Sequence, residues 1–188
     1  MTKIAVLVGS LRKESFSRKI AENVMELFPD PFETEIIPIG DLPLYNQDFD
    51  DDGNPPHQWT TFREKIKEFD AVLFVTPEYN RSVPGVLKNA IDIGSRPKVD
   101  SVWNDKPAAI ISNSPRNLSG FGANHHLRQS LVFFNMPIVQ QPEAYLANVA
   151  TLLDDNGKIN NNDTVQFLQS VVDAFVDLIT TFKANERN

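Results

Sequence analysis

The chain has 188 residues, of which 41% are hydrophobic, and this size and composition fit a single compact domain spanning residues 1–188. Its net charge of -7 argues against nucleic acid and against an anionic membrane as partners. Because the chain contains no cysteine, disulfides, thiolate catalysis and cysteine-ligated clusters are excluded. A strand is expected almost at the N-terminus, and no apolar run approaches the roughly 20 residues that span a bilayer. We therefore expect a cytoplasmic protein.

Strands and helices are expected to alternate along the chain. Short apolar runs bounded by turn residues predict strands at 3–8, 34–39, 71–75 and 107–111, and the start of a short fifth strand at 137–139. Apolar residues at helical spacing predict helices at about 17–28, 57–68, 86–93, 123–134 and 163–183, with loops at 40–56 and 94–105. This alternation predicts a doubly wound α/β fold, with a five-stranded parallel sheet in the order 2-1-3-4-5 and helices on both faces.

The first candidate site segment directly follows the strand at 3–8. Gly9 allows a tight turn, and Arg12 adds a charged guanidinium before a helix whose first N–H groups are unpaired. Hydroxyl donors are supplied by Ser10, Ser15 and Ser17. This set is typical of a phosphate-monoester site, and ordinary helix capping by Ser15 or Ser17 explains it about equally well. The segment is neither a P-loop nor a dinucleotide-binding glycine fingerprint, which disfavours phosphotransferases and Rossmann dehydrogenases.

The second candidate segment, 76–92, follows the buried strand at 71–75. It offers the Tyr79 ring, the Asn80 amide and exposed backbone groups, which suit a flat heterocycle. The structural alternative is a proline-braced turn with Ser82 capping the next helix. Because ligands bind at the carboxyl ends of the strands in such sheets, the two segments together predict one site. A third loop, 112–122, has the small residues that permit close approach to a ligand, although a surface turn would look the same.

Two other patterns resemble metal sites, and neither is expected to bind a metal. The acidic segment 48–53 mimics half of a calcium-binding loop, but Trp59 stands where the final glutamate is needed, so a solvated acidic loop is expected. His125 and His126 are adjacent on a helix and point about 100° apart, so they do not converge on one ion.

The chain resembles the NADPH-dependent FMN reductase family, especially its quinone and chromate reductase-like branch. The matching residues are Gly9-Ser10-Leu11-Arg12 with Ser15-Phe16, the segment 77–92, His126-Leu127-Arg128-Gln129, Ser95-Arg96-Pro97 and Lys106-Pro107. The resemblance covers roughly the first three-quarters of the chain. It implies a flavodoxin-like fold, bound FMN and NADPH or NADH as co-substrate. It also implies ping-pong hydride transfer to quinones, flavins, azo or nitro compounds, or metal oxyanions.

The resemblance also implies roles for particular residues. The FMN phosphate and ribityl chain would be held by Ser10, Arg12, Ser15, Phe16 and Ser17. The isoalloxazine would be lined by Pro77, Glu78, Tyr79, Asn80 and Arg81, with Ser114 at its polar edge. The flavin carries the chemistry, so no catalytic side chain is required. A flavodoxin-type electron carrier, which turns over no small substrate, is the alternative.

The chain departs from the family pattern at two positions. Arg81 stands where relatives commonly have an aromatic or small residue, which makes it a candidate contact for NADPH or the acceptor. Gly122 stands where relatives often have arginine, so any NADPH or subunit contact made by that side chain is lost. The family implies small-molecule electron acceptors and a homodimer or homotetramer. Aromatic residues near the site fit an oligomer, and burial in the core is the alternative for them: Trp103, Phe121, Phe133 and Phe134.

Overall fold

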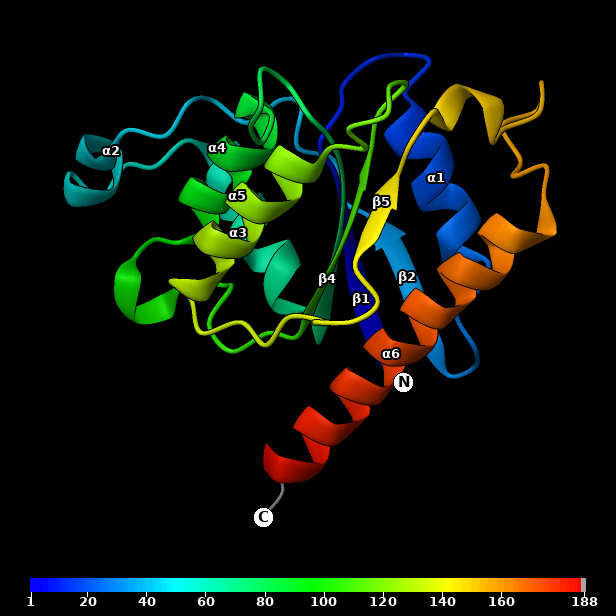
Figure 1. Cartoon of the computed structure of the whole chain (residues 1–188). Helices are drawn as coiled ribbons and strands as arrows, with labels where there is room; N and C mark the ends of the chain where they lie inside the picture. Colours follow the sequence, from blue (N-terminus) through cyan, green and yellow to red (C-terminus); the bar gives the residue numbers. More distant parts are fainter. Residues whose placement is uncertain (187–188) are drawn as a thin grey trace.

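Five parallel strands form the centre of the computed structural model, which describes residues 1–186 (Figure 1). Their order across the sheet is β2-β1-β3-β4-β5, which confirms the predicted topology. The strands are β1 (Thr2–Val8), β2 (Phe32–Ile36), β3 (Ala71–Pro77), β4 (Ala108–Asn113) and β5 (Ala144–Leu146). The three inner strands are almost continuous apolar runs because helices cover both of their faces.

Helices pack on both faces of this sheet (Figure 1). One face carries α1 (Phe16–Met25) and α6 (Asn162–Glu186), and the other carries α3 (His57–Lys67), α4 (Gly85–Gly94) and α5 (Phe121–Val132). Each face has its own core. The first includes Ile20, Val24, Val171 and Phe175, and the second includes Trp59, Leu87, Ile91, Trp103 and Leu127. The sheet is therefore held as a rigid centre between two apolar layers.

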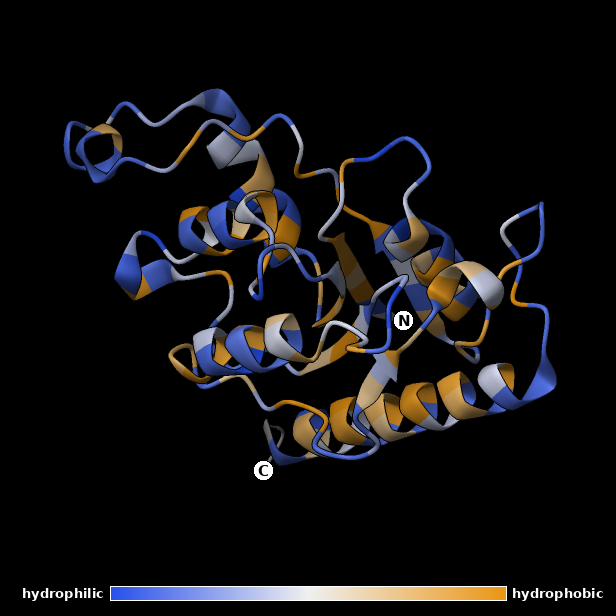
Figure 2. Ribbon diagram, turned by 45° about the horizontal axis from the view of Figure 1, so that its top comes forward, coloured by the Kyte–Doolittle hydropathy of each residue, from blue (hydrophilic) through white to orange (hydrophobic). Residues whose placement is uncertain are grey.

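The helix α6 is long and apolar enough, by length and composition alone, to cross a membrane. Its apolar stripe packs on the sheet beside α1, and the buried members of that stripe are Leu168, Val171, Val172, Phe175 and Ile179. In Figure 2 hydrophobic segments recur along the helix, and the central strands are mostly hydrophobic. One stripe of α6 is thus part of the core, and 28% of its apolar window is buried.

Two strand predictions were wrong in position. The predicted start of the fifth strand at 137–139 makes only a single bridge, from Ile138 to Ala108, and β5 begins at Ala144, where it pairs with Ile111. The second strand lies at 32–36, earlier than the predicted 34–39. Ile37 and Ile39 beyond it are buried in the α3 core, so their apolar character reflects packing after the strand has ended.

The predicted loop at 40–56 contains the short helix α2 (Gln47–Asp51), which extends away from the sheet in Figure 1. The expectation of a solvated acidic loop was wrong for Asp50, whose carboxylate makes two hydrogen bonds of 2.7 Å with the Arg63 guanidinium. Both side chains are largely buried. The predicted loop at 94–105 includes a 3-10 turn at Lys98–Asp100, and a second such turn follows β5 at Val149–Thr151.

Candidate functional site

The first and second candidate segments meet where β1 and β3 end. The backbone N–H of Gly9 donates to the Val75 carbonyl at 2.9 Å, which extends the strand pairing by one residue. A Cβ atom at Gly9 would lie 2.6 Å from Thr76 Oγ1, so a larger residue does not fit without displacement. Glycine therefore allows the first loop to lie directly against the end of β3.

The first loop leads into α1, whose N-terminus faces this edge of the sheet. Ser15 is the N-cap residue, and its hydroxyl accepts a hydrogen bond from the Arg18 N–H at 3.1 Å. Within residues 1–186, the N–H groups of Phe16 and Ser17 have no protein acceptor, as expected for the first turn of a helix. Two free donors at the positive end of a helix dipole suit a phosphate.

Positive charge gathers beside that helix terminus. A hollow of about 180 Å³ is lined by Ser10, Leu11, Arg12, Arg18 and the segment 36–40. Arg12 is exposed and stacks over the Phe16 ring at 5.9 Å. The Arg12 guanidinium and the free N–H donors suit a phosphate in a chain of net charge -7, whereas the Arg18 guanidinium is paired with Glu22 at 3.1 Å.

Ser17 has a different environment from its neighbours in the loop. Its side chain is buried, and its hydroxyl hydrogen-bonds the side-chain amide of Asn113 at the end of β4, with a 2.9 Å contact from the amide nitrogen. The same amide nitrogen reaches the Thr76 carbonyl at 3.4 Å. The Ser17 hydroxyl is thus engaged within the protein, and among the described residues the backbone N–H is the hydrogen-bond donor of Ser17 that stays free.

The second loop forms a tight turn centred on Asn80 and Arg81. Tyr79 and Ser82 exchange two backbone hydrogen bonds of 3.1 Å each, and φ is +51° at Asn80 and +69° at Arg81. Positive φ at both central residues is the pattern of a type I′ turn. Tyr79 is 44% exposed, so its ring is available for contact with a flat ligand.

The side chains of Glu78 and Arg81 contact each other. The Arg81 Nη1 atom lies 3.6 Å from Glu78 Oε1, and the Arg81 side chain is 73% exposed while that of Glu78 is 11% exposed. The other carboxylate oxygen of Glu78 accepts a hydrogen bond from the Ala123 backbone N–H at 3.2 Å. The Glu78 carboxylate is therefore engaged with protein groups on both sides.

The third loop brings Ser114 to the same edge. Its hydroxyl accepts from the Arg116 N–H at 3.1 Å, and its own N–H donates to the Leu146 carbonyl.

Beside the loop, the Phe121 ring lies 4.2 Å from that of His125, which hydrogen-bonds the Tyr145 hydroxyl at 3.0 Å. Burial raises the pKa of Tyr145 to about 12, and the nearby Glu143 adds to the effect.

The two adjacent histidines serve different elements. His125 contacts Tyr145 of β5, and His126 Nδ1 hydrogen-bonds the Ser82 hydroxyl of the second loop at 2.9 Å. Among the described residues, no group of His, Asp and Glu side chains is arranged to hold a metal ion. Both rings are therefore explained by contacts with neighbouring elements.

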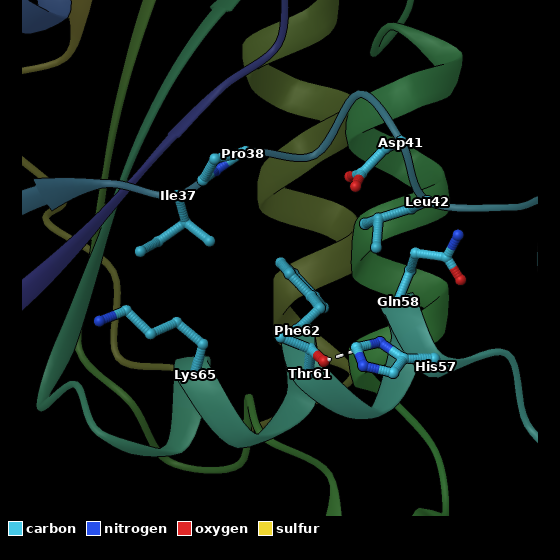
Figure 3. Close-up of a pocket in the computed structure, with 9 residues that line it drawn as sticks. All are labelled: Ile37, Pro38, Asp41, Leu42, His57, Gln58, Thr61, Phe62 and Lys65. Atoms are coloured by element: carbon cyan, nitrogen blue, oxygen red, sulfur yellow. Dashed lines mark hydrogen bonds between the residues drawn. The ribbon is translucent and has the colours of Figure 1, made fainter.

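A separate pocket of about 280 Å³ lies between the segment after β2 and α3 (Figure 3). Its apolar walls include Ile37, Leu42 and Phe62, and the His57 ring contacts Thr61 at its rim. None of the predicted site residues lines it. This pocket is therefore distinct from the loop cluster at the strand ends.

The structural roles of some residues near the site were not predicted from the sequence. Asn113 links the first loop to β4, and Asn124 donates to the Ser112 hydroxyl at 3.3 Å beneath the third loop. Gly122 allows close contact between α5 and the second loop, because a Cβ atom there would lie 2.8 Å from the Arg81 carbonyl oxygen. The only sequence signal for Asn113 is its position as a polar residue at the end of a buried strand.

Comparisons with known proteins agree with this geometry. The family described as NADPH-dependent FMN reductase matches residues 2–151. A quinone reductase of Pseudomonas putida is 55% identical over 96% of each chain, and a 2-hydroxy-1,4-benzoquinone reductase of Burkholderia sp. is 43% identical over 92% of this chain and 93% of its own. The structure of the flavoenzyme NAD(P)H:(acceptor) oxidoreductase FerB from Paracoccus denitrificans superposes with a TM-score of 0.89 at 39% identity, covering 97% of this chain and 99% of its own.

The five-stranded parallel sheet defines a flavodoxin-like fold of the doubly wound α/β class. The chain belongs to the NADPH-dependent FMN reductase family. It is an oxidoreductase that uses FMN as its cofactor and NAD(P)H as its co-substrate.

Proposed function

We propose that this protein is a quinone reductase that binds FMN across the loops at the carboxyl ends of β1, β3 and β4 and uses NAD(P)H as the electron donor. The observation that carries the proposal is the junction at Gly9, where a helix N-terminus with free N–H donors lies beside an exposed aromatic turn on the neighbouring strand. The helix N-terminus suits a phosphate, and the aromatic turn suits a flat ring system. The quinone reductase relatives support a quinone as the acceptor.

The phosphate end of FMN is assigned to the first loop. The N–H groups of Phe16 and Ser17 donate to the phosphate, Arg12 supplies the charge, and Ser10 and Ser15 contribute from the loop and the helix cap. The Ser17 hydroxyl both donates to and accepts from Asn113, so Ser17 contributes through its backbone, whereas the Ser15 hydroxyl accepts from Arg18 and keeps its own O–H as a donor.

The ring end of FMN is assigned to the second and third loops. Backbone groups at Pro77 and Glu78, the Tyr79 ring and the Asn80 amide line the isoalloxazine, Arg81 lies at its rim, and Ser114 lies at its polar edge. FMN, when bound, supplies the two-electron redox chemistry, and the protein supplies binding, orientation and electrostatics. NAD(P)H and the acceptor use the same open side in turn, so ping-pong kinetics with parallel double-reciprocal lines are expected.

We further propose a cytoplasmic homodimer or homotetramer. Phe121, the first residue of α5, and Phe133, which follows its last residue, are 54% and 67% exposed, and a groove of about 390 Å³ between α4 and α5 lies beside the second loop. The two exposed phenylalanine side chains support contact with a second copy, whereas the lining of the groove is mostly polar. The other two aromatic residues considered for this role, Trp103 and Phe134, are buried in the core, so they do not contribute to it.

The visible spectrum of the purified protein tests FMN binding. Flavin absorption after purification, or quenching of FMN fluorescence on titration of the apoprotein, is expected. Riboflavin should bind more weakly because it lacks the phosphate. A colourless protein that also fails to bind added FMN would contradict the proposal.

A further inference from the structure

The helix α5 begins without a capping side chain of its own. Its N-cap residue is Gly120, with φ at +76°, and no side chain within the described part of this helix caps it. The acceptor comes instead from Glu78, because its Oε2 atom takes the Ala123 N–H at 3.2 Å. A carboxylate at a helix N-terminus is favoured both by the unpaired N–H groups and by the helix dipole. Glu78 thus caps a helix that lies 45 residues further along the chain.

The turn after Glu78 lies against the start of α5. A Cβ atom at Gly122 would be 2.8 Å from the Arg81 carbonyl oxygen and 3.0 Å from Glu78 Oε2, so only glycine permits this close contact. On the far side of the turn, Ser82 hydrogen-bonds His126 at 2.9 Å. The turn is therefore attached to α5 at three places: Glu78, the Arg81 backbone and Ser82.

The turn needs such support because of its backbone conformation. Arg81 has φ at +69°, a conformation that non-glycine residues adopt rarely and that persists where surrounding contacts impose it. The guanidinium of the same residue lies 3.6 Å from the Glu78 carboxylate. One carboxylate oxygen of Glu78 therefore serves the α5 cap, and the other partly offsets the charge of Arg81.

We propose that Glu78 is a positioning residue that fixes the flavin-facing turn 79–82 on the N-terminus of α5 and sets the charge that Arg81 presents to NAD(P)H. Its side chain acts through Ala123 and Arg81 rather than by contact with the ring. The inference rests on the proposed placement of FMN against this turn.

Amide hydrogen exchange in the apoprotein, followed by NMR at Ala123, tests the cap without FMN. Loss of a hydrogen bond to a charged acceptor in Glu78→Ala should accelerate exchange at Ala123 about tenfold or more. Glu78→Gln retains a side-chain oxygen that accepts from the same N–H, so its exchange rate should stay within about threefold of the wild-type rate. Asp100→Asn is the matched control, because it removes an ion-paired carboxylate that contacts Lys67, and it should leave Ala123 exchange unchanged.

Ligand binding and kinetics separate the two roles of the carboxylate. Glu78→Ala should weaken FMN binding about tenfold in a fluorescence titration, and Glu78→Gln should restore most of that affinity. In Glu78→Gln the uncompensated Arg81 should lower the KM for NADPH, more strongly at low salt, with kcat little changed. Gly122→Ala, which displaces the turn while keeping Glu78, should weaken FMN in the same direction as Glu78→Ala.

Different results would contradict different parts of the proposal. Wild-type exchange at Ala123 in Glu78→Ala would overturn the capping role. If Glu78→Gln lost as much FMN affinity as Glu78→Ala while Ala123 stayed protected in both, Glu78 would contact the flavin directly and the proposal would be wrong. Failure of the wild-type protein to bind FMN would instead contradict the proposed function, whereas the exchange measurement would still decide whether Glu78 holds α5.

Discussion

The side chains of Ser17 and Asn113 hydrogen-bond each other in the protein interior, although the two residues are 96 positions apart in the sequence. The contact joins the first turn of α1 to the last residue of β4. Because the Asn113 amide also reaches the Thr76 carbonyl, one buried side chain links the ends of β3 and β4 to the helix that we propose binds the phosphate. The relative placement of the three loops depends on this link.

Asn113→Ala is predicted to reduce the free energy of unfolding of the apoprotein by about 1–3 kcal/mol, because it leaves the buried Ser17 hydroxyl without a partner. Ser17→Ala should reduce the free energy of unfolding by a similar amount, because it leaves the buried Asn113 amide without its Ser17 partner. The double variant should lose less free energy of unfolding than the two single variants lose together. The difference, the coupling energy, should be about 0.5–3 kcal/mol by urea denaturation. Ser130→Ala, whose hydroxyl contacts only its own helix, is the control and should change stability by less than about 0.5 kcal/mol. Additive single effects would contradict the link.

Arg12→Ala is predicted to weaken FMN binding by about 1.5–3 kcal/mol, the range for a hydrogen bond to a charged group. Riboflavin binding should change little because riboflavin has no phosphate for Arg12 to contact. The neighbouring exposed cation provides the control, since Lys13→Ala removes equal charge and should affect FMN only slightly. Isothermal or fluorescence titration measures the FMN and riboflavin affinities of each variant and of the wild type. Equal losses for FMN and riboflavin would refute the phosphate contact.

Arg81→Tyr is predicted to raise the KM for NADPH, because it removes an exposed guanidinium beside the site. The effect should be largest at low ionic strength, where screening is weakest. Since Glu78 lies 3.6 Å from the guanidinium and offsets part of its charge, the change should be modest. It is measured by steady-state kinetics across a salt series. An unchanged KM at low salt would mean that Arg81 is only a surface residue.

The strands that carry the site were predicted well because their sequences are dominated by burial. The apolar runs of β1, β3 and β4 lie between two helical layers, so composition alone identifies them. The short strand β5 was misplaced because its residues have no alternation of their own, and its position depends on pairing with 111–113. The helix α2 was missed because its charged sequence is held by the ion pair between Asp50 and Arg63, a tertiary contact.

Within the site, too, features encoded in the local sequence were predicted, and features that depend on tertiary contacts were not. Gly9, Ser10, Arg12 and the turn at 79–81 were identified because a strand followed by small and polar residues is informative locally. The engagement of Ser17 by Asn113 and of Glu78 by Ala123 was not predicted, because each joins residues that are distant in the sequence. Local pattern thus located the loops, and only the folded geometry showed which of their side chains are engaged by other parts of the protein.

Oxidation of NADPH in the presence of menadione, followed at 340 nm with the FMN-loaded protein, tests the central claim most directly. Sustained turnover that depends on both FMN and the quinone is the predicted result, with parallel double-reciprocal lines when both substrates are varied. FMN that stays bound while NADPH is not consumed would contradict a quinone reductase and indicate an electron carrier instead.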